Sequence, residues 1–281
     1  MISVDLRERF GFGVLFLATM LVVVPVILII WLIIDKGKSA ITWEFLLSMP
    51  RDGMRAGGIF PAIIGTFYLV LGSITFSLPV GVMAAIYLNE YAKDNLLTRL
   101  INLSIINLAG VSSVVYGLFG LSLFVVFLKF GVSIIAGSLT LGIMSLPVII
   151  TTTREALRAV PTSYREVSFS LGTTRWQTIR HSVLPFALPG ILTGAILSIG
   201  RAAGETAPIL FTVAAFYLPK LPSSITDQAM ALPYHLYIIS TQIPNIRLDF
   251  RYGTAFVLVA MVLIMNLSAV IIRSKFRKIR W

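Results

Sequence analysis

The sequence has 281 residues, of which 57% are hydrophobic and only 12% are charged. Soluble domains are about 45–50% apolar and about 25% charged, so this composition predicts an integral membrane protein. The absence of cysteine excludes disulfide bonds, thiolate metal sites and cysteine catalysis. The formal net charge is +11. Because the basic residues flank apolar runs, we assign this charge to membrane orientation and anionic lipid headgroups, and we expect no nucleic acid partner.

Six apolar runs are long enough to cross a bilayer, which requires about 20 helical residues. We expect spans at about 12–34, 62–88, 101–128, 131–153, 186–216 and 252–272. The runs are continuous rather than alternating in hydrophobicity, so helices are expected and barrel strands are not. The first run is longer than a signal-peptide core and lacks a small-residue cleavage site before Asp35, so it is taken as a helix. The whole chain, 1–281, is then a single transmembrane domain.

The distribution of Lys and Arg predicts the orientation. The two ends of the chain and the loops 89–100 and 154–184 together carry fourteen of the 23 basic residues. The loops 35–55, 129–130 and 218–251 carry eight, and Arg201 is the remaining one. Because cytoplasmic loops are richer in Lys and Arg, we expect both termini and the loop 154–184 in the cytoplasm.

Two charged residues, Arg201 and Glu205, lie inside an apolar run that reads SIGRAAGETAPIL over 198–210. An arginine at the bilayer centre costs ~2.5–3.5 kcal/mol on insertion scales, so such residues face a bundle interior or a water-filled path. The spacing of four places both on one helical face, although Arg before Glu is the less favourable order for a pair. Gly204 weakens the helix and Pro208 removes a backbone donor, so a kink or break is expected there.

Two interpretations of these charges stay open on the residues alone. The pair could be a buried ion pair that fixes helix packing, or it could be a charged element of an anion path. Pairing within the helix and pairing with another helix are both possible. A second cluster, Tyr116 with Ser112 and Ser113 among nearby glycines, is interpreted as close helix packing rather than as a site.

The loop 154–184 is far more polar than its flanks. Ser163 followed three residues later by Glu166 matches a capping box, which predicts a short helix from about 164 to 171. Gly172 then supplies a residue that tolerates positive φ at the end of this helix.

Thr174 and Gln177 repeat the capping-box pattern and predict a second short helix. Two short helices around a glycine favour a knob that docks on a partner protein. A basic helix that lies on anionic lipid is the alternative.

Motifs of enzyme chemistry are missing from the sequence. It contains no G-x-x-x-x-G-K-[ST] phosphate-binding loop, so ATP-driven transport would need another chain to hydrolyse ATP. The two histidines, His181 and His235, are far apart in sequence and do not form a metalloprotease motif. We therefore expect a protein that is not itself an enzyme and that has no cofactor or metal.

The segment 153–185 resembles the cytoplasmic signature loop of bacterial ABC importer permeases, which is E-A-A, three residues, Gly, nine residues, I-x-L-P. Glu166, Gly172, Leu184 and Pro185 match this pattern at the right spacing. The positions of its Ala, Ala and Ile are occupied by Val167, Ser168 and Ser182. In that family the loop is a coupling helix seated in a cleft of the ATP-hydrolysing subunit. The resemblance thus assigns ATPase coupling to Pro161, Tyr164, Arg165, Glu166, Ser168, Leu171 and Gly172.

Four further segments are similar to the PstA-type permeases of the bacterial phosphate (Pst) importer: GGIFPAIIGT (57–66), LNEYAK (88–93), GRAAGETAPILFT (200–212) and ALPYHLY (231–237). Ser112 stands where that family commonly has proline, so the helix there is expected to be straighter than usual. Thr151 stands where relatives often carry arginine, with Arg154 one turn later.

This resemblance implies an all-α integral membrane protein with six transmembrane helices of the type I ABC importer permease class and a cytoplasmic coupling helix. It would reside in the bacterial plasma (inner) membrane and transport inorganic phosphate. The implied partners are a homologous second permease (PstC-type), two ATP-hydrolysing subunits (PstB-type) and an extracytoplasmic phosphate-binding protein (PstS-type). Arg201 and Glu205 would line the substrate path, with the helix break at Gly204 and Pro208.

Two alternatives are weighed against this interpretation. One is a permease for another oxyanion, molybdate or sulfate, but those relatives lack the R-x-x-G-E-T-A-P segment that begins at Arg201. The other is an ion-coupled membrane carrier, for which the sequence offers neither an inverted repeat nor a second broken helix.

Overall fold

The computed structural model describes residues 4–278, and nearly all of its regular structure is helical. The helices are α1 (Val4–Gly37), α2 (Trp43–Leu47), α3 (Phe60–Ile86), α4 (Leu96–Ala109), α5 (Ser113–Gly120), α6 (Ile134–Arg158), α7 (Thr162–Ser170), α8 (Arg175–Thr178), α9 (Leu184–Gly204), α10 (Ala207–Thr212), α11 (Leu232–Thr241) and α12 (Leu248–Lys278). Strands β1 (Pro50–Arg51) and β2 (Ala56–Gly57) form a small antiparallel hairpin. Short π-helical turns follow α3, α5 and α8 at Tyr87–Tyr91, Leu121–Phe127 and Ile179–Val183.

Five continuous helical segments are long and apolar enough to cross a membrane: Gly11–Ala40, Phe60–Tyr91, Ile134–Arg158, Arg175–Gly204 and Leu248–Lys275. The pair Leu96–Ala109 and Ser113–Phe127 makes a sixth candidate, although it is bent by 106°. These segments agree with the expected helical membrane protein, while two of the expected spans differ in shape.

The expected span over 101–128 is two helices, and the expectation of a straighter helix at Ser112 is wrong. Gly110 caps the end of α4, and Ser112 has an extended backbone with φ −61° and ψ 143° immediately before α5. Glycine has low helix propensity, and an extended residue is the usual entry to a new helix. The chain therefore turns sharply here without a proline. The expected span over 186–216 is also divided, as described below.

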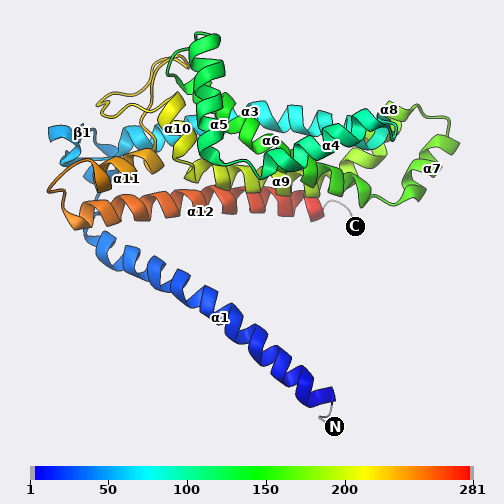
Figure 1. The fold of residues 1–281 in the computed structure, drawn as a ribbon, viewed down its shortest axis with the longest axis horizontal. Helices are drawn as coiled ribbons and strands as arrows, with labels where there is room; N and C mark the ends of the chain where they lie inside the picture. Colours follow the sequence, from blue (N-terminus) through cyan, green and yellow to red (C-terminus); the bar gives the residue numbers. More distant parts are fainter. Residues whose placement is uncertain (1–3, 279–281) are drawn as a thin grey trace.

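Helices α3, α6, α9 and α12 lie side by side along the main body of the molecule (Figure 1). Helix α6 is central, since it packs against both α3 and α9. Small residues let α3 and α6 approach closely: Gly72 lies against Ser138, and Gly142 lies against the ring of Phe76. A side chain at either glycine would collide with these neighbours, so close backbone approach holds the two helices together.

The end of the body opposite α7 is closed by short elements (Figure 1). Helix α11 docks on α3, where the backbone N–H of Leu232 donates to the Thr66 hydroxyl at 2.8 Å. The main apolar core lies beneath these elements and includes Phe45, Met54 and Ile239. His235 of α11 is also buried there, and its burial lowers its pKa to about 4, so it is neutral at ordinary pH.

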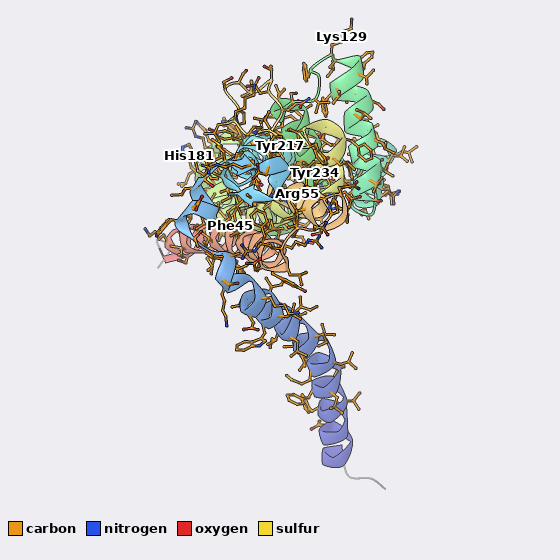
Figure 2. The ribbon with its side chains drawn as sticks, turned by 90° about the vertical axis from the view of Figure 1, so that its left-hand side faces the viewer. Phe45, Arg55, Lys129, His181, Tyr217 and Tyr234 are labelled. Atoms are coloured by element: carbon orange, nitrogen blue, oxygen red, sulfur yellow. The ribbon has the colours of Figure 1, made fainter. Side chains whose placement is uncertain are left out.

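Helix α1 stands apart from the body (Figure 1), and its side chains project from an isolated rod (Figure 2). Its apolar segment, which covers the expected first span, is not buried against the described chain. It joins the body only near its last turn, where Gly37 lies against the backbone of Tyr252 and the Lys36 ammonium lies 5.4 Å from the Tyr252 ring centroid. Because the exposed surface of α1 is almost entirely apolar, it requires lipid or another chain around it.

The orientation can be tested with single cysteines, because the natural chain has none. Ser39, Ser224 and Ser163 are all exposed, and Ser163 lies in α7. We predict that cysteines at Ser39 and Ser224 react with a membrane-impermeant thiol reagent on whole cells or spheroplasts. A cysteine at Ser163 should react only after permeabilisation, because α7 is expected in the cytoplasm. The reverse labelling pattern would overturn the orientation.

The chain ends, residues 1–3 and 279–281, lie outside the described residues.

Candidate functional site

The helix that carries Arg201 ends just before Glu205, so the break lies between the two charged residues. Helix α9 ends at Gly204, and Glu205 has an extended backbone with φ −73° and ψ 137°. Helix α10 begins at Ala207 with Pro208 in its first turn, where a missing N–H has no helical acceptor to lose. The segment is thus divided where Gly204 and Pro208 were expected to weaken it.

Arg201 and Glu205 pair with each other across this break. The Arg201 Nε donates to Glu205 Oε1 at 3.3 Å, and the two side chains are 33% and 17% exposed. This is the only hydrogen bond of the Arg201 side chain within residues 4–278, so both of its terminal amino groups keep their donors available. The pair therefore holds a partly solvent-accessible cation that can still bind an anion.

Two buried polar side chains lie on or against the part of α9 just before Arg201. Ser198 is on α9 one turn before Arg201, and its hydroxyl is buried without a hydrogen-bond partner in the described chain. Asn266 of α12 lies against Gly200, and its amide oxygen is likewise unpartnered among the residues described. Sequence reasoning missed Asn266, although a lone amide inside an apolar run was a usable signal. A polar side chain of α12 thus lies directly beside α9, one residue before Arg201.

The residues around Tyr116 serve packing. The Tyr116 hydroxyl donates to the carbonyl of Leu108 at 2.8 Å, which ties α5 back to α4 across the bend. A side chain at Gly117 would collide with Phe211 and approach Pro208, so α5 lies directly on α10. Helix α5 thereby supports the segment that follows the break.

Arg154 joins two helices in another place. Its Nη1 donates to Asn102 Oδ1 at 2.6 Å, which connects α6 to α4. The hydroxyl of Thr151, one turn earlier, donates to the carbonyl of Pro147 in its own helix at 2.8 Å. Arg154 is thus directed toward α4. Among residues 4–278, it forms no hydrogen bond with Arg201 or Glu205.

The loop between α6 and α9 folds as two short helices around a glycine turn. Helix α7 begins at Thr162 with Pro161 at its N-cap, so the predicted capping box of Ser163 and Glu166 is wrong. The helix begins two residues too early for it, and Ser163 falls within the first turn. Gly172 has φ +77°, the left-handed conformation expected of it.

The second short helix, α8, carries the predicted capping box. The Gln177 N–H donates to Thr174 Oγ1 at 3.3 Å, and the Thr174 N–H donates to Gln177 Oε1 at 2.8 Å. Ser168 connects the two helices, since its hydroxyl lies 2.8 Å from Thr173 Oγ1 and 3.0 Å from Thr178 Oγ1. The loop is therefore one compact unit.

The seven residues expected to couple to an ATPase divide into two groups. Five are exposed: Pro161, Tyr164, Glu166, Leu171 and Gly172. Two turn inward: Ser168 binds the threonines of the α8 turn, and Arg165 pairs with Glu90 at 2.7 Å. The sequence did not single out Val167, which is exposed and lines a groove of about 320 Å³ together with Tyr164 and Leu171. The exposed surface of α7 thus combines apolar side chains and hydroxyls with one carboxylate and no basic residue.

The fold and these features define a class of transport protein. A crystal structure of a bacterial ABC transporter involved in the import of the acidic polysaccharide alginate contains a chain that aligns with 96% of this chain and 97% of its own length. That alignment has a TM-score of 0.70 and 14% identity. An inward-facing MetNI methionine ABC transporter aligns over 78% of this chain and 94% of its own, with a TM-score of 0.60 and 18% identity. The fold is that of type I ABC importer permeases.

The sequence comparisons then give the family. Residues 77–278 match the family described as "Binding-protein-dependent transport system inner membrane component", and this chain belongs to that family. The chain is 34% identical over 263 residues to the phosphate transport system permease protein PstA 1 of Mycobacterium tuberculosis (strain CDC 1551 / Oshkosh), covering 92% of this chain and 86% of that one. It is 36% identical over 251 residues to the probable ABC transporter permease protein YqgI of Bacillus subtilis (strain 168), covering 84% and 85%. The chain is a multi-pass permease subunit of the inner membrane and is not an enzyme.

Replacing Gly172 tests the turn between α7 and α8. Nothing lies within 4 Å of a Cβ built at Gly172, so a larger residue would fit but would be strained by the φ of +77°. A left-handed backbone costs a residue with a Cβ about 1–2 kcal/mol. We predict that Gly172→Val speeds trypsin cleavage of the loop in inside-out vesicles that lack the ATPase. Ser170→Val, two residues earlier in α7, is the control, and equal cleavage rates in both variants would contradict this account of the turn.

Proposed function

We propose that this chain is one of the two membrane-spanning permease subunits of a phosphate ABC importer. The observation that carries this is the paired Arg201 and Glu205 at the broken end of α9, in a chain whose relatives of similar length include phosphate permeases. As an ABC importer permease it works with a second permease, ATPase subunits and a binding protein. We infer that these partners are of the PstC, PstB and PstS types.

The chemistry of the pair suits a passing oxyanion. Phosphate carries between about one and two negative charges near neutral pH, and a guanidinium matches its oxygens with two parallel hydrogen bonds. The Arg201 amino groups not used by Glu205 supply such donors. Glu205 balances the cation when phosphate is absent, and it keeps the anion from binding too tightly to leave.

The exposed face of α7 is the proposed docking surface for the ATPase subunit. Val167 and Leu171 offer apolar contact, and Glu166 supplies a charge at the surface. The compact fold of the loop, tied together by Ser168, presents this face as a rigid knob. A lipid-bound helix is a poorer interpretation, because the residues that face outward on α7 include a carboxylate and no lysine or arginine.

The proposed function is tested by reconstitution. Co-expression with the three partner types followed by incorporation into liposomes should give ATP-driven uptake of phosphate, with ATPase activity that rises when phosphate-loaded binding protein is present. Uptake of sulfate or molybdate in place of phosphate would favour the other oxyanion permeases. Phosphate uptake driven by an ion gradient without ATP would favour a carrier.

Neutralising the pair separates its two interpretations. Arg201→Gln should nearly abolish phosphate uptake while the complex still assembles, because no cation meets the anion. Removing one partner leaves the other charge without its counter-ion, so Arg201→Gln combined with Glu205→Gln should restore any lost assembly but not uptake. The control is Lys129→Gln, which removes a positive charge at the exposed tip of the molecule (Figure 2). If uptake were restored in the neutral double variant, the pair would serve only to fix helix packing.

Reversing the charge at Glu166 tests the docking surface. We predict that Glu166→Lys leaves membrane insertion intact and reduces co-purification of the ATPase subunit, since Glu166 is exposed on α7. The matched control is Glu155→Lys, the same charge change at an exposed position of α6. Normal co-purification and transport in the Glu166 variant would place the docking surface elsewhere.

A further inference from the structure

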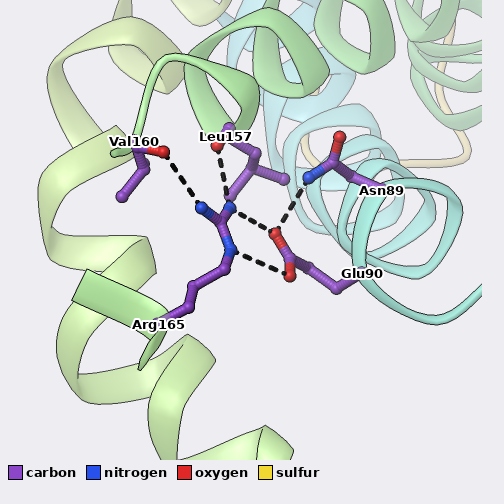
Figure 3. A network of polar contacts seen from close by, with 5 residues as sticks. All are labelled: Asn89, Glu90, Leu157, Val160 and Arg165. Atoms are coloured by element: carbon purple, nitrogen blue, oxygen red, sulfur yellow. Dashed lines mark hydrogen bonds and ion pairs between the residues drawn. The ribbon is translucent and has the colours of Figure 1, made fainter. Parts of the chain in front are cut away.

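The guanidinium of Arg165 lies at the junction of three elements (Figure 3). It pairs with Glu90, where Nη2 donates to Oε1 at 2.7 Å and Nε donates to Oε2 at 3.4 Å. It also donates from Nη1 to the carbonyl of Val160 and from Nη2 to the carbonyl of Leu157, both at 3.0 Å. One side chain of α7 thus binds the carbonyl end of α6 and the cytoplasmic end of the α3 span.

The local structure of each element directs its group into this junction. Glu90 belongs to the π-helical turn Tyr87–Tyr91, which extends the α3 span beyond its last α-helical residue. The Asn89 amide donates to Glu90 Oε1 at 2.9 Å, so this oxygen is held by both Asn89 and Arg165. The carbonyls of Leu157 and Val160 lie at the C-terminal end of α6, where helices leave carbonyls without intrahelical partners and favour cations.

The junction is protected from solvent, unlike a comparable pair nearby. The side chains of Arg165 and Glu90 are 19% and 11% exposed. Arg99 also forms a two-pronged pair, with Asp94, but those side chains are 69% and 74% exposed. Exposed pairs contribute little, whereas a fully hydrogen-bonded buried pair fixes the relative position of its elements. Arg165 is therefore not available to touch an ATPase subunit.

We propose that Arg165 is a positioning residue that clamps α7 to the cytoplasmic ends of α3 and α6 through Glu90, so that a displacement of α7 moves both spans. This inference rests on the proposed function, in which α7 is the surface that the ATPase subunit displaces. It assigns Arg165 to transmission and leaves docking to the exposed face of α7. Glu90, which lies 75 positions away in the sequence, becomes part of the coupling apparatus.

The movement of α7 relative to α3 can be measured directly with spin labels. Cysteines at Ser170, exposed at the end of α7, and Met83, exposed on α3, accept nitroxides without competition from native cysteines. In the assembled importer with native Arg165, the distance distribution between the labels should be the same without nucleotide and with a non-hydrolysable ATP analogue. In the Arg165→Gln background it should broaden or shift when the analogue binds. Arg99→Gln, which breaks the exposed pair, should behave as the wild type does.

A second measurement connects the clamp to transport. In liposomes, Arg165→Gln and Glu90→Gln should keep their ATPase subunits and basal ATPase activity, while stimulation by phosphate-loaded binding protein falls about fivefold or more, the lower range of coupling effects. Arg165→Lys should lie between these and the wild type, because one ammonium group cannot reach the carboxylate and both carbonyls in the same geometry.

The outcomes separate this proposal from the proposed function. Failure of the wild-type chain to bind ATPase subunits would overturn both proposals. Wild-type phosphate transport with unchanged label distances and unchanged stimulation in Arg165→Gln would overturn the clamp alone. Loss of assembly in both glutamine variants, with native label distances in Arg165→Lys and full stimulation there, would reduce the pair to a role in folding.

Discussion

A guanidinium inside a membrane protein loses much of its hydration shell, so the chain must give it polar partners or place it in a water-filled path. The region around Arg201 is organised by this requirement. Glu205 supplies the opposite charge, but it does so from an extended residue beyond the last turn of α9. The helix break and the cation pair are thus one feature, since an interrupted helix at membrane depth is tolerated where it lines a cavity or is covered by protein.

The surrounding helices hold this interruption in place. The segment after the break, α10, is supported by α5, whose Gly117 permits direct contact with Pro208. The sharp bend between α4 and α5 brings α5 to that position, and Tyr116 braces the bend. At the end of the bundle that carries α7, the spans α3 and α6 are joined to α7 through Arg165. Movement at the loop can therefore reach the rigid bundle that contains the charged break.

Much of this arrangement is encoded in short segments and could be predicted. Gly204 and Pro208 act on the backbone of their own helix, and the Thr174 capping box forms among neighbouring residues. The bend at Ser112 was missed because a bend was expected only from a proline, whereas Gly110 ends α4 and the extended backbone of Ser112 starts α5 without one. The pairing of Arg165 with Glu90 was missed because the two residues are 75 positions apart in the sequence, and Arg165 was assigned with its neighbours to ATPase coupling.

The central claim is that phosphate passes the charge pair at the end of α9. A cysteine at Gly204 tests it most directly, because the position is exposed and has nothing within 4 Å of an added Cβ. In the reconstituted importer, its rate of reaction with a small cationic thiol reagent should fall when phosphate, binding protein and ATP are supplied, and sulfate should not slow it. An unchanged rate in a variant that still imports phosphate would contradict the account.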